Sequence, residues 1–99
     1  MSYSDAVTLD ARLRLLQLLA SNPAYTGNEV VLPLELVRKY GHTLTRDRVR
    51  TELTWLEDQG LLVLQKPGGI ILATLTSSGL EVSCGIGRNP GVAAPRPGE

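Results

Sequence analysis

Arginines crowd into one short stretch of this 99-residue chain, where Arg46, Arg48 and Arg50 occupy alternate positions. Arginine presents a planar fork of N–H donors that fits phosphate oxygens and the edge of guanine, so the cluster indicates nucleic-acid recognition. Hydroxyl and basic side chains on and around the same stretch could add hydrogen bonds or charge. These further candidates for contact with DNA are Thr51, Thr54, Lys39, His42 and Lys66.

The formal net charge is zero, because ten Lys and Arg residues balance ten Asp and Glu residues. Taken alone, this balance argues against a protein that binds nucleic acid strongly without regard to sequence. The charge is uneven, however, since residues 38–50 carry five basic residues and one acidic residue, and a neutral chain can therefore present a basic patch. Asp47 would repel phosphate and Arg48 is spaced to pair with Glu52, so we expect one copy to bind DNA weakly.

Two helices joined by a short turn are predicted to position these arginines. A proline suits the first turn of a helix over residues 33–40, which Gly41 would end. Thr45 can cap a second helix over residues 45–59, which would stop at Gly60. Two helices in this arrangement, the second strongly amphipathic, are typical of a helix-turn-helix.

An N-terminal helix over residues 5–20, capped by Ser4, is predicted from a stripe of leucines at helical spacing. Its leucines cover more than the one face that a single packing contact needs; they are Leu9, Leu13, Leu15, Leu16, Leu18 and Leu19. Two interpretations follow. The helix is either a central one that other elements contact from two sides, or the seam of a homodimer.

The C-terminal half predicts a β-hairpin followed by a short helix. Apolar runs over residues 61–65 and 70–75 flank the segment Lys66-Pro67-Gly68-Gly69, whose composition is that of a turn. Thr76 or Ser77 can cap the helix that comes next.

Other segments lack a helical pattern. Residues 25–29 are interpreted as a loop, and residues 30–32 as a short strand or the lead-in to a helix. Residues 85–99 hold four of the ten glycines and three of the six prolines. We therefore expect one domain over residues 1–84 and a flexible tail over residues 85–99.

Three helices, a two-stranded hairpin and a short C-terminal helix, in that order, predict an α+β fold, mainly α, of the winged helix-turn-helix type. Residues 44–50 and 60–63 resemble the recognition helix and first wing strand of bacterial winged-helix regulators. Residues 75–81 resemble the passage from the second wing strand to the final helix. This resemblance implies that residues 45–59 form a recognition helix whose first turns meet base edges in the major groove.

A closer resemblance covers most of the chain, which is similar to a family of small proteins encoded in Mu-like transposable phages and prophages. The matching segments are residues 46–50, 55–57, 59–61, 73–76, 79–82 and 88–92, with Leu53, Gly85 and Pro95. In that family Lys-Arg-Pro usually follows the last segment, whereas this chain has Ala93-Ala94-Pro95. The family implies a winged-helix fold and a phage context, and the two missing positive charges weaken any grip of the tail on phosphate.

Two functions remain open. The first is a phage or prophage DNA-binding protein, a transcriptional regulator that recognises double-stranded DNA with residues 45–59. The alternative is a winged-helix module that binds another phage or host protein without binding DNA.

Several classes of protein are not expected. One cysteine, Cys84, cannot form an internal disulfide, and together with the one histidine, His42, it provides too few ligands for a metal site. Nothing supports a catalytic Cys-His pair, so we expect neither an enzyme nor a cofactor. No apolar run approaches about 18 residues, and residues 1–6 lack the features of a secretory signal. We therefore expect no membrane span and a location in the cytoplasm of a bacterial host.

Overall fold

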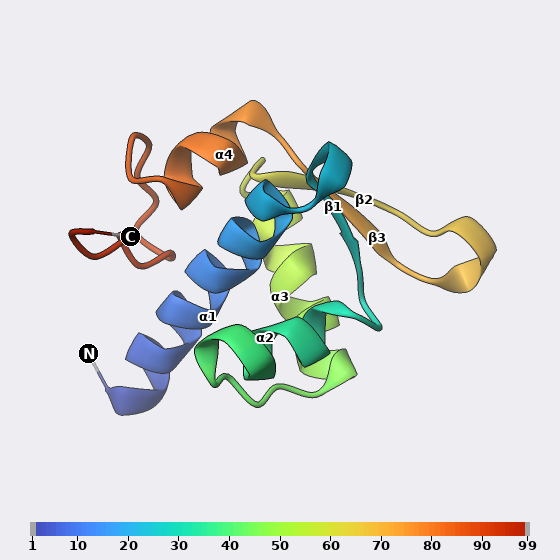
Figure 1. Cartoon of the computed structure of the whole chain (residues 1–99), viewed down its shortest axis with the longest axis horizontal. Helices are drawn as coiled ribbons and strands as arrows, with labels where there is room; N and C mark the ends of the chain where they lie inside the picture. The colour runs from blue at the N-terminus through green and yellow to red at the C-terminus, as the bar shows by residue number, and fades with distance from the viewer. Residues whose placement is uncertain (1, 99) are drawn as a thin grey trace.

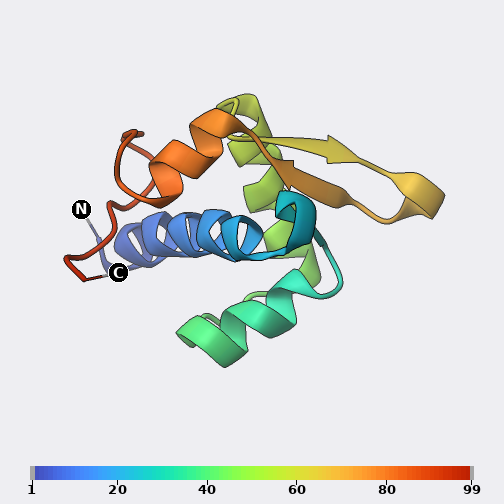
Figure 2. The ribbon, with the colours of Figure 1, turned by 45° about the horizontal axis from the view of Figure 1, so that its top comes forward.

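The leucine-rich N-terminal segment forms the longest helix, α1 (Tyr3–Ser21), and the other helices and the sheet pack around it (Figures 1 and 2). The structure is a computed structural model that describes residues 2–98. Helix α1 begins earlier than the sequence predicts, because Ser2 and not Ser4 caps it: the Ser2 hydroxyl accepts a hydrogen bond from the Asp5 N–H at 3.2 Å. No helix within residues 2–98 is long and apolar enough to cross a membrane.

The wide leucine stripe of α1 is explained by packing inside one copy of the chain. Helix α1 contacts α2 (Leu32–Tyr40), α4 (Ser77–Ser83) and the sheet. Its buried leucines are Leu13, Leu15, Leu16, Leu18 and Leu19, each at most 1% exposed. The burial of these side chains within one copy agrees with the interpretation as a central helix, and the homodimer stays a prediction.

The pair of helices before the hairpin has the ends that the sequence predicts. Helix α2 ends at Gly41, whose φ of 74° is the left-handed conformation that glycine adopts at low cost. Helix α3 (Arg46–Asp58) begins after Thr45, whose hydroxyl accepts a hydrogen bond from the Arg48 N–H at 3.0 Å. The inner face of α3 consists of Val49, Leu53 and Leu56, all fully buried.

Three antiparallel strands form the sheet, in the order β1 (Thr26–Asn28), β3 (Leu72–Leu75), β2 (Leu62–Gln65). The predicted hairpin is confirmed as β2 and β3, joined through a short turn at Pro67–Gly69. It projects from the rest of the molecule (Figure 1).

The loop predicted over residues 25–29 was wrong for the residues that form strand β1. Thr suits a strand but Gly and Asn do not, and β3 supplies the partner that this short segment needs, with Thr26 opposite Thr74 and Asn28 opposite Leu72. Gly27 lets the core approach, because a Cβ there would lie 3.0 Å from the side chains of Leu19 and Leu32. The strand therefore exists because of tertiary contacts.

The C-terminal segment after α4 differs from the flexible tail that its composition predicts. It returns along α1, where the Ala93 N–H donates to the Leu9 carbonyl oxygen at 3.1 Å. Val92 is 7% exposed and belongs to the core. Gly91 packs so closely on the Trp55 ring that a Cβ at this position would overlap the ring. Glycine lets the backbone pass close to the helices here, and residues 91–93 belong to the same packed unit as the preceding residues.

Val92→Asp is expected to lower the free energy of unfolding by about 2–3 kcal/mol, because it places an unpaired charge in a buried apolar position. Ile86→Asp is the matched control, since Ile86 lies in the same segment and is 77% exposed. Urea unfolding followed by circular dichroism would measure both. Equal stability of the two variants would mean that the segment does not pack against the core in solution.

Candidate nucleic-acid interface

The outward face of α3 carries the residues that the sequence singled out on this helix. Arg46, Arg48, Arg50, Thr51 and Thr54 are all exposed. The Thr51 and Thr54 hydroxyls donate hydrogen bonds to backbone carbonyl oxygens one turn earlier, at 3.1 and 2.9 Å. The helix therefore presents a short polar face with arginines along its edges.

On one edge of α3, two arginines share a single buried carboxylate. Glu29 lies just after β1 and is 0% exposed. Its Oε1 accepts hydrogen bonds from Arg46 Nε at 2.9 Å and from Arg50 Nε and Nη2 at 3.1 and 2.6 Å. Its Oε2 accepts from the backbone N–H of Ile71, at the start of the strand region that forms β3. One side chain thus connects α3, the end of β1 and the residue before β3, at the end of the sheet that is nearer the hairpin turn.

The same contacts control the protonation of this carboxylate. The Ile71 N–H, followed by the Arg46 and Arg50 guanidiniums, lowers the pKa of Glu29 from 4.5 to about 2, although burial acts in the opposite direction. Glu29 is therefore ionised at neutral pH, and its charge offsets one of the two arginines that it holds.

On the other edge, a second buried carboxylate is shared in the same way. Arg48 Nε donates to Glu52 Oε2 at 2.7 Å, which confirms the ion pair expected from their spacing. Arg12, from α1, donates through Nε to Glu52 Oε1 at 2.7 Å. The Arg12 guanidinium also lies 3.8 Å from the centre of the Trp55 ring, a favourable cation–π contact.

These two glutamates decide the charge of the α3 face. Around the first turns of α3, four guanidiniums and the carboxylates of Glu29, Glu52 and the exposed Asp47 leave an excess of one positive charge, and the exposed Asp58 at the end of the helix offsets it. The arginines still have donors to offer, because a guanidinium has five N–H groups. The side chains of Arg46, Arg48 and Arg50 remain 49%, 47% and 44% exposed. The face is thus a set of fixed guanidiniums with little net charge.

The remaining predicted contact residues do not gather on this face. His42 points to α1, where its Nε2 lies 2.7 Å from Asp10 Oδ2, and its side chain is 14% exposed. Lys39 is exposed near the end of α2, and Lys66 is exposed at the tip of the hairpin. These two ends lie on opposite sides of the molecule (Figure 1). Lys66 alone of the three lies on an element that projects beside α3.

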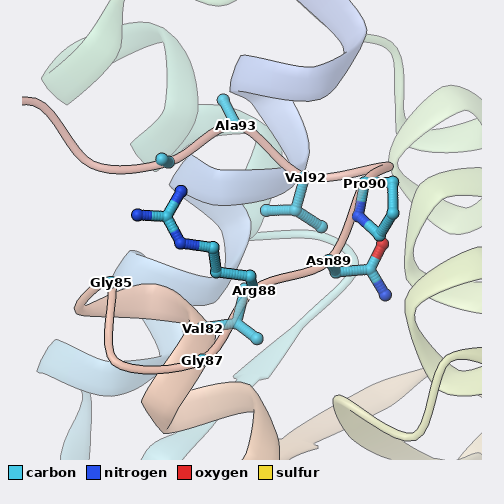
Figure 3. A pocket seen from close by; sticks show the side chains of 9 residues that line it. Val82, Gly85, Gly87, Arg88, Asn89, Pro90, Val92 and Ala93 are labelled. Carbon is cyan, nitrogen blue, oxygen red and sulfur yellow. The ribbon is translucent and has the colours of Figure 1, made fainter.

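A separate hollow of about 380 Å³ lies at the C-terminal segment (Figure 3). The Arg88 side chain extends between Gly85 and Ala93, across the loop (Figure 3). The residues that line this hollow are Val82, Gly85, Gly87, Arg88, Asn89, Pro90, Val92, Ala93 and Ala94. Arg88 is the one ionisable side chain among them, so the lining offers a single cation and no acid–base pair. Within residues 2–98, no three His, Cys, Asp or Glu side chains cluster as metal ligands would.

Comparison with known proteins gives a family. No family model and no solved structure matches the chain. It is 42% identical over 94 residues to an uncharacterized protein of Haemophilus influenzae, covering 89% of this chain and 88% of that protein. It is 38% identical over 96 residues to the uncharacterized protein gp26 of Escherichia phage Mu, covering 95% of this chain and 96% of that protein. The chain therefore belongs to a family of small proteins that has a member in phage Mu.

Proposed function

We propose that this protein is a winged-helix DNA-binding protein of a transposable phage or prophage, and that it acts as a transcriptional regulator. The observation that supports the proposal is the order of elements, α1-β1-α2-α3-β2-β3, with the sheet order β1-β3-β2. This order sets a helix-turn-helix beside a projecting hairpin (Figure 2). Helix α3 is then the recognition helix and the hairpin is the wing.

In this proposal α3 enters the major groove with its polar outer face. Arg50, Thr51 and Thr54 contact base edges, while Arg46 and Arg48 contact the phosphates on either side. Because Glu29 and Glu52 already hold these arginines, less side-chain entropy is lost when DNA binds. The small net charge of this face keeps non-specific binding weak, with a dissociation constant on the order of 10⁻⁴ to 10⁻⁶ M.

Replacing Arg46, Arg48 and Arg50 together with alanine is expected to abolish a gel shift of phage DNA at ~50 mM salt, because it removes the guanidiniums that contact phosphates and base edges. The control replaces Arg88 and Arg96 with alanine, which removes two charges from the C-terminal segment and should leave the shift in place. Circular dichroism would show whether each variant is folded.

A second variant tests the proposal without disturbing the buried glutamates. Asp47→Asn removes the exposed carboxylate of the α3 face and should strengthen binding about threefold at low salt. Failure of the wild-type protein to shift any phage DNA at low salt would overturn the proposal. It would favour the second candidate, a module that binds a phage or host protein in place of DNA.

A further inference from the structure

Aliphatic side chains lie exposed in a row along the outer side of α2 and the turn before it. Val30, Val31, Leu34 and Val37 are 43%, 42%, 62% and 45% exposed. We call these four residues the α2 row. Leu34 and Val37 lie on the side of the helix opposite the face that buries Leu32 and Leu36, and Val30 and Val31 precede the helix in the turn. A surface helix normally carries polar residues on its outer side, so an apolar row there indicates a surface that binds another molecule.

The start of the α2 row is held by a specific turn. The side-chain Oδ1 of Asn28 accepts hydrogen bonds from the backbone N–H groups of Val30 and Val31, both at 2.9 Å. This turn fixes the backbone that carries the two valines. Ile70, 42% exposed, lies between the hairpin turn and Ile71, whose carbonyl oxygen accepts a hydrogen bond from the Glu29 N–H.

The other exposed large apolar residues of the described chain do not form a comparable row. They are Tyr3, Tyr25, Val63 and Ile86, and they come from four different elements or loops. Single exposed apolar side chains are ordinary on a protein surface, whereas several at helical spacing indicate an interaction site.

Positive charge stands at both ends of the α2 row. Arg38 and Lys39 are exposed at its C-terminal end. Arg46 and Arg50 lie at its N-terminal end, because both are held by Glu29, the residue before Val30. The carboxylate carried by α2 itself is Glu35, which is half-buried. The surface therefore combines an aliphatic centre with cationic ends.

From this arrangement we propose that the α2 row is a docking surface for an amphipathic helix of another protein, one whose aliphatic side chains are flanked by carboxylates. Nine residues of α2 extend about 13 Å, enough to contact two turns of such a helix. Docking here is a second activity, and the surface that it uses shares Arg46 and Arg50 with the α3 face proposed to contact DNA.

The charges favour this occupant over a second copy of the chain. A symmetric dimer brings the same surface of both copies together. Since both ends of the α2 row are cationic, like charges would meet in either orientation of the two helices, which disfavours such a contact. A membrane surface is also disfavoured, because four aliphatic side chains without an aromatic residue give a small face for insertion.

The test uses a random library of short peptides displayed on yeast and selected for binding to the full chain. The enriched peptides are expected to carry a net negative charge and aliphatic residues at helical spacing. Fluorescence anisotropy of these peptides should show that Leu34→Glu weakens binding at least about tenfold, since a carboxylate then replaces the most exposed residue of the row. Ile86→Glu, at an exposed site in the C-terminal segment, should change it less than about twofold.

A charge variant and a DNA measurement complete the test. Replacing Arg38 and Lys39 with glutamate should weaken the same peptides several-fold, and a gel shift with Leu34→Glu should match that of the wild type. Four results would overturn the docking surface: peptides that bind Leu34→Glu as well as the wild type, enrichment of basic peptides, a wild-type dimer in sedimentation that Leu34→Glu dissociates, or binding to phosphatidylserine vesicles that Leu34→Glu abolishes. Loss of the DNA shift in Leu34→Glu would also overturn it, by assigning the row to the DNA surface.

Discussion

Gly79→Ala is expected to destabilise this protein by about 3 kcal/mol, although alanine is usually the better helix former by about 1 kcal/mol. Gly79 lies within α4, where a Cβ would overlap the carbonyl oxygen of Leu61 and lie 2.6 Å from Leu75 Cδ1. A backbone carbonyl cannot rotate away as a flexible side chain can. This one also accepts a hydrogen bond from the Thr76 N–H at 3.1 Å, so any shift would disturb the start of α4.

Urea unfolding of Gly79→Ala beside Ser78→Ala would measure the effect. Ser78 is the neighbouring exposed position of the same helix, so its replacement should change stability by no more than about 0.5 kcal/mol. If Gly79→Ala were as stable as the wild type, α4 would not lie as close to the backbone of Leu61 as the structure places it.

Glu29→Gln is expected to lower the midpoint of urea unfolding at about pH 7, because it removes the charge that holds Arg46 and Arg50. The wild type should also lose stability in acid. Hydrogen bonding from the Ile71 N–H and the two arginines lowers the pKa of Glu29 from 4.5 to about 2 in the folded protein. A carboxylate with a lowered pKa stabilises the fold above its unfolded pKa, and that contribution disappears as pH falls through the folded value.

The advantage of the wild type over Glu29→Gln should therefore be constant above pH 4.5 and shrink between pH 4.5 and about 2. Unfolding midpoints of both proteins across this range would measure it. Glu81→Gln serves as the control, since Glu81 is exposed on α4. An unchanged gap between wild type and Glu29→Gln across the range would contradict the ionised pairing of Glu29.

The helices and the hairpin followed from local chemistry. Thr45 as a cap, Gly41 as a stop and the turn at Pro67–Gly69 act within a few residues of themselves, so their effects are visible in a linear sequence. Strand β1 escaped prediction because its three residues form a strand only beside β3, which lies far along the chain. The return of the C-terminal segment was missed for the same reason, since Gly91 meets Trp55 only after folding.

The residues of the candidate DNA surface also fall into two groups, those that the sequence predicts and those that it does not. The arginines of α3 were found because they are clustered and lie at exposed positions of an amphipathic helix. Their partners were not, because Glu29 lies 17 residues before Arg46 and Arg12 lies 40 residues before Glu52. Of the ion pairs on this face, Arg48–Glu52 has a spacing that a helix dictates.

The amino-acid sequence by itself determined which side chains α3 turns outward, because helical periodicity and capping are local properties. Only the tertiary structure decided how much charge those side chains keep. A carboxylate must be brought within hydrogen-bond distance, and shielded from water, before it can hold two guanidiniums and cancel one of them. For Glu29 and for Arg12 that distance is set by the packing of β1, α1 and α3 around one core.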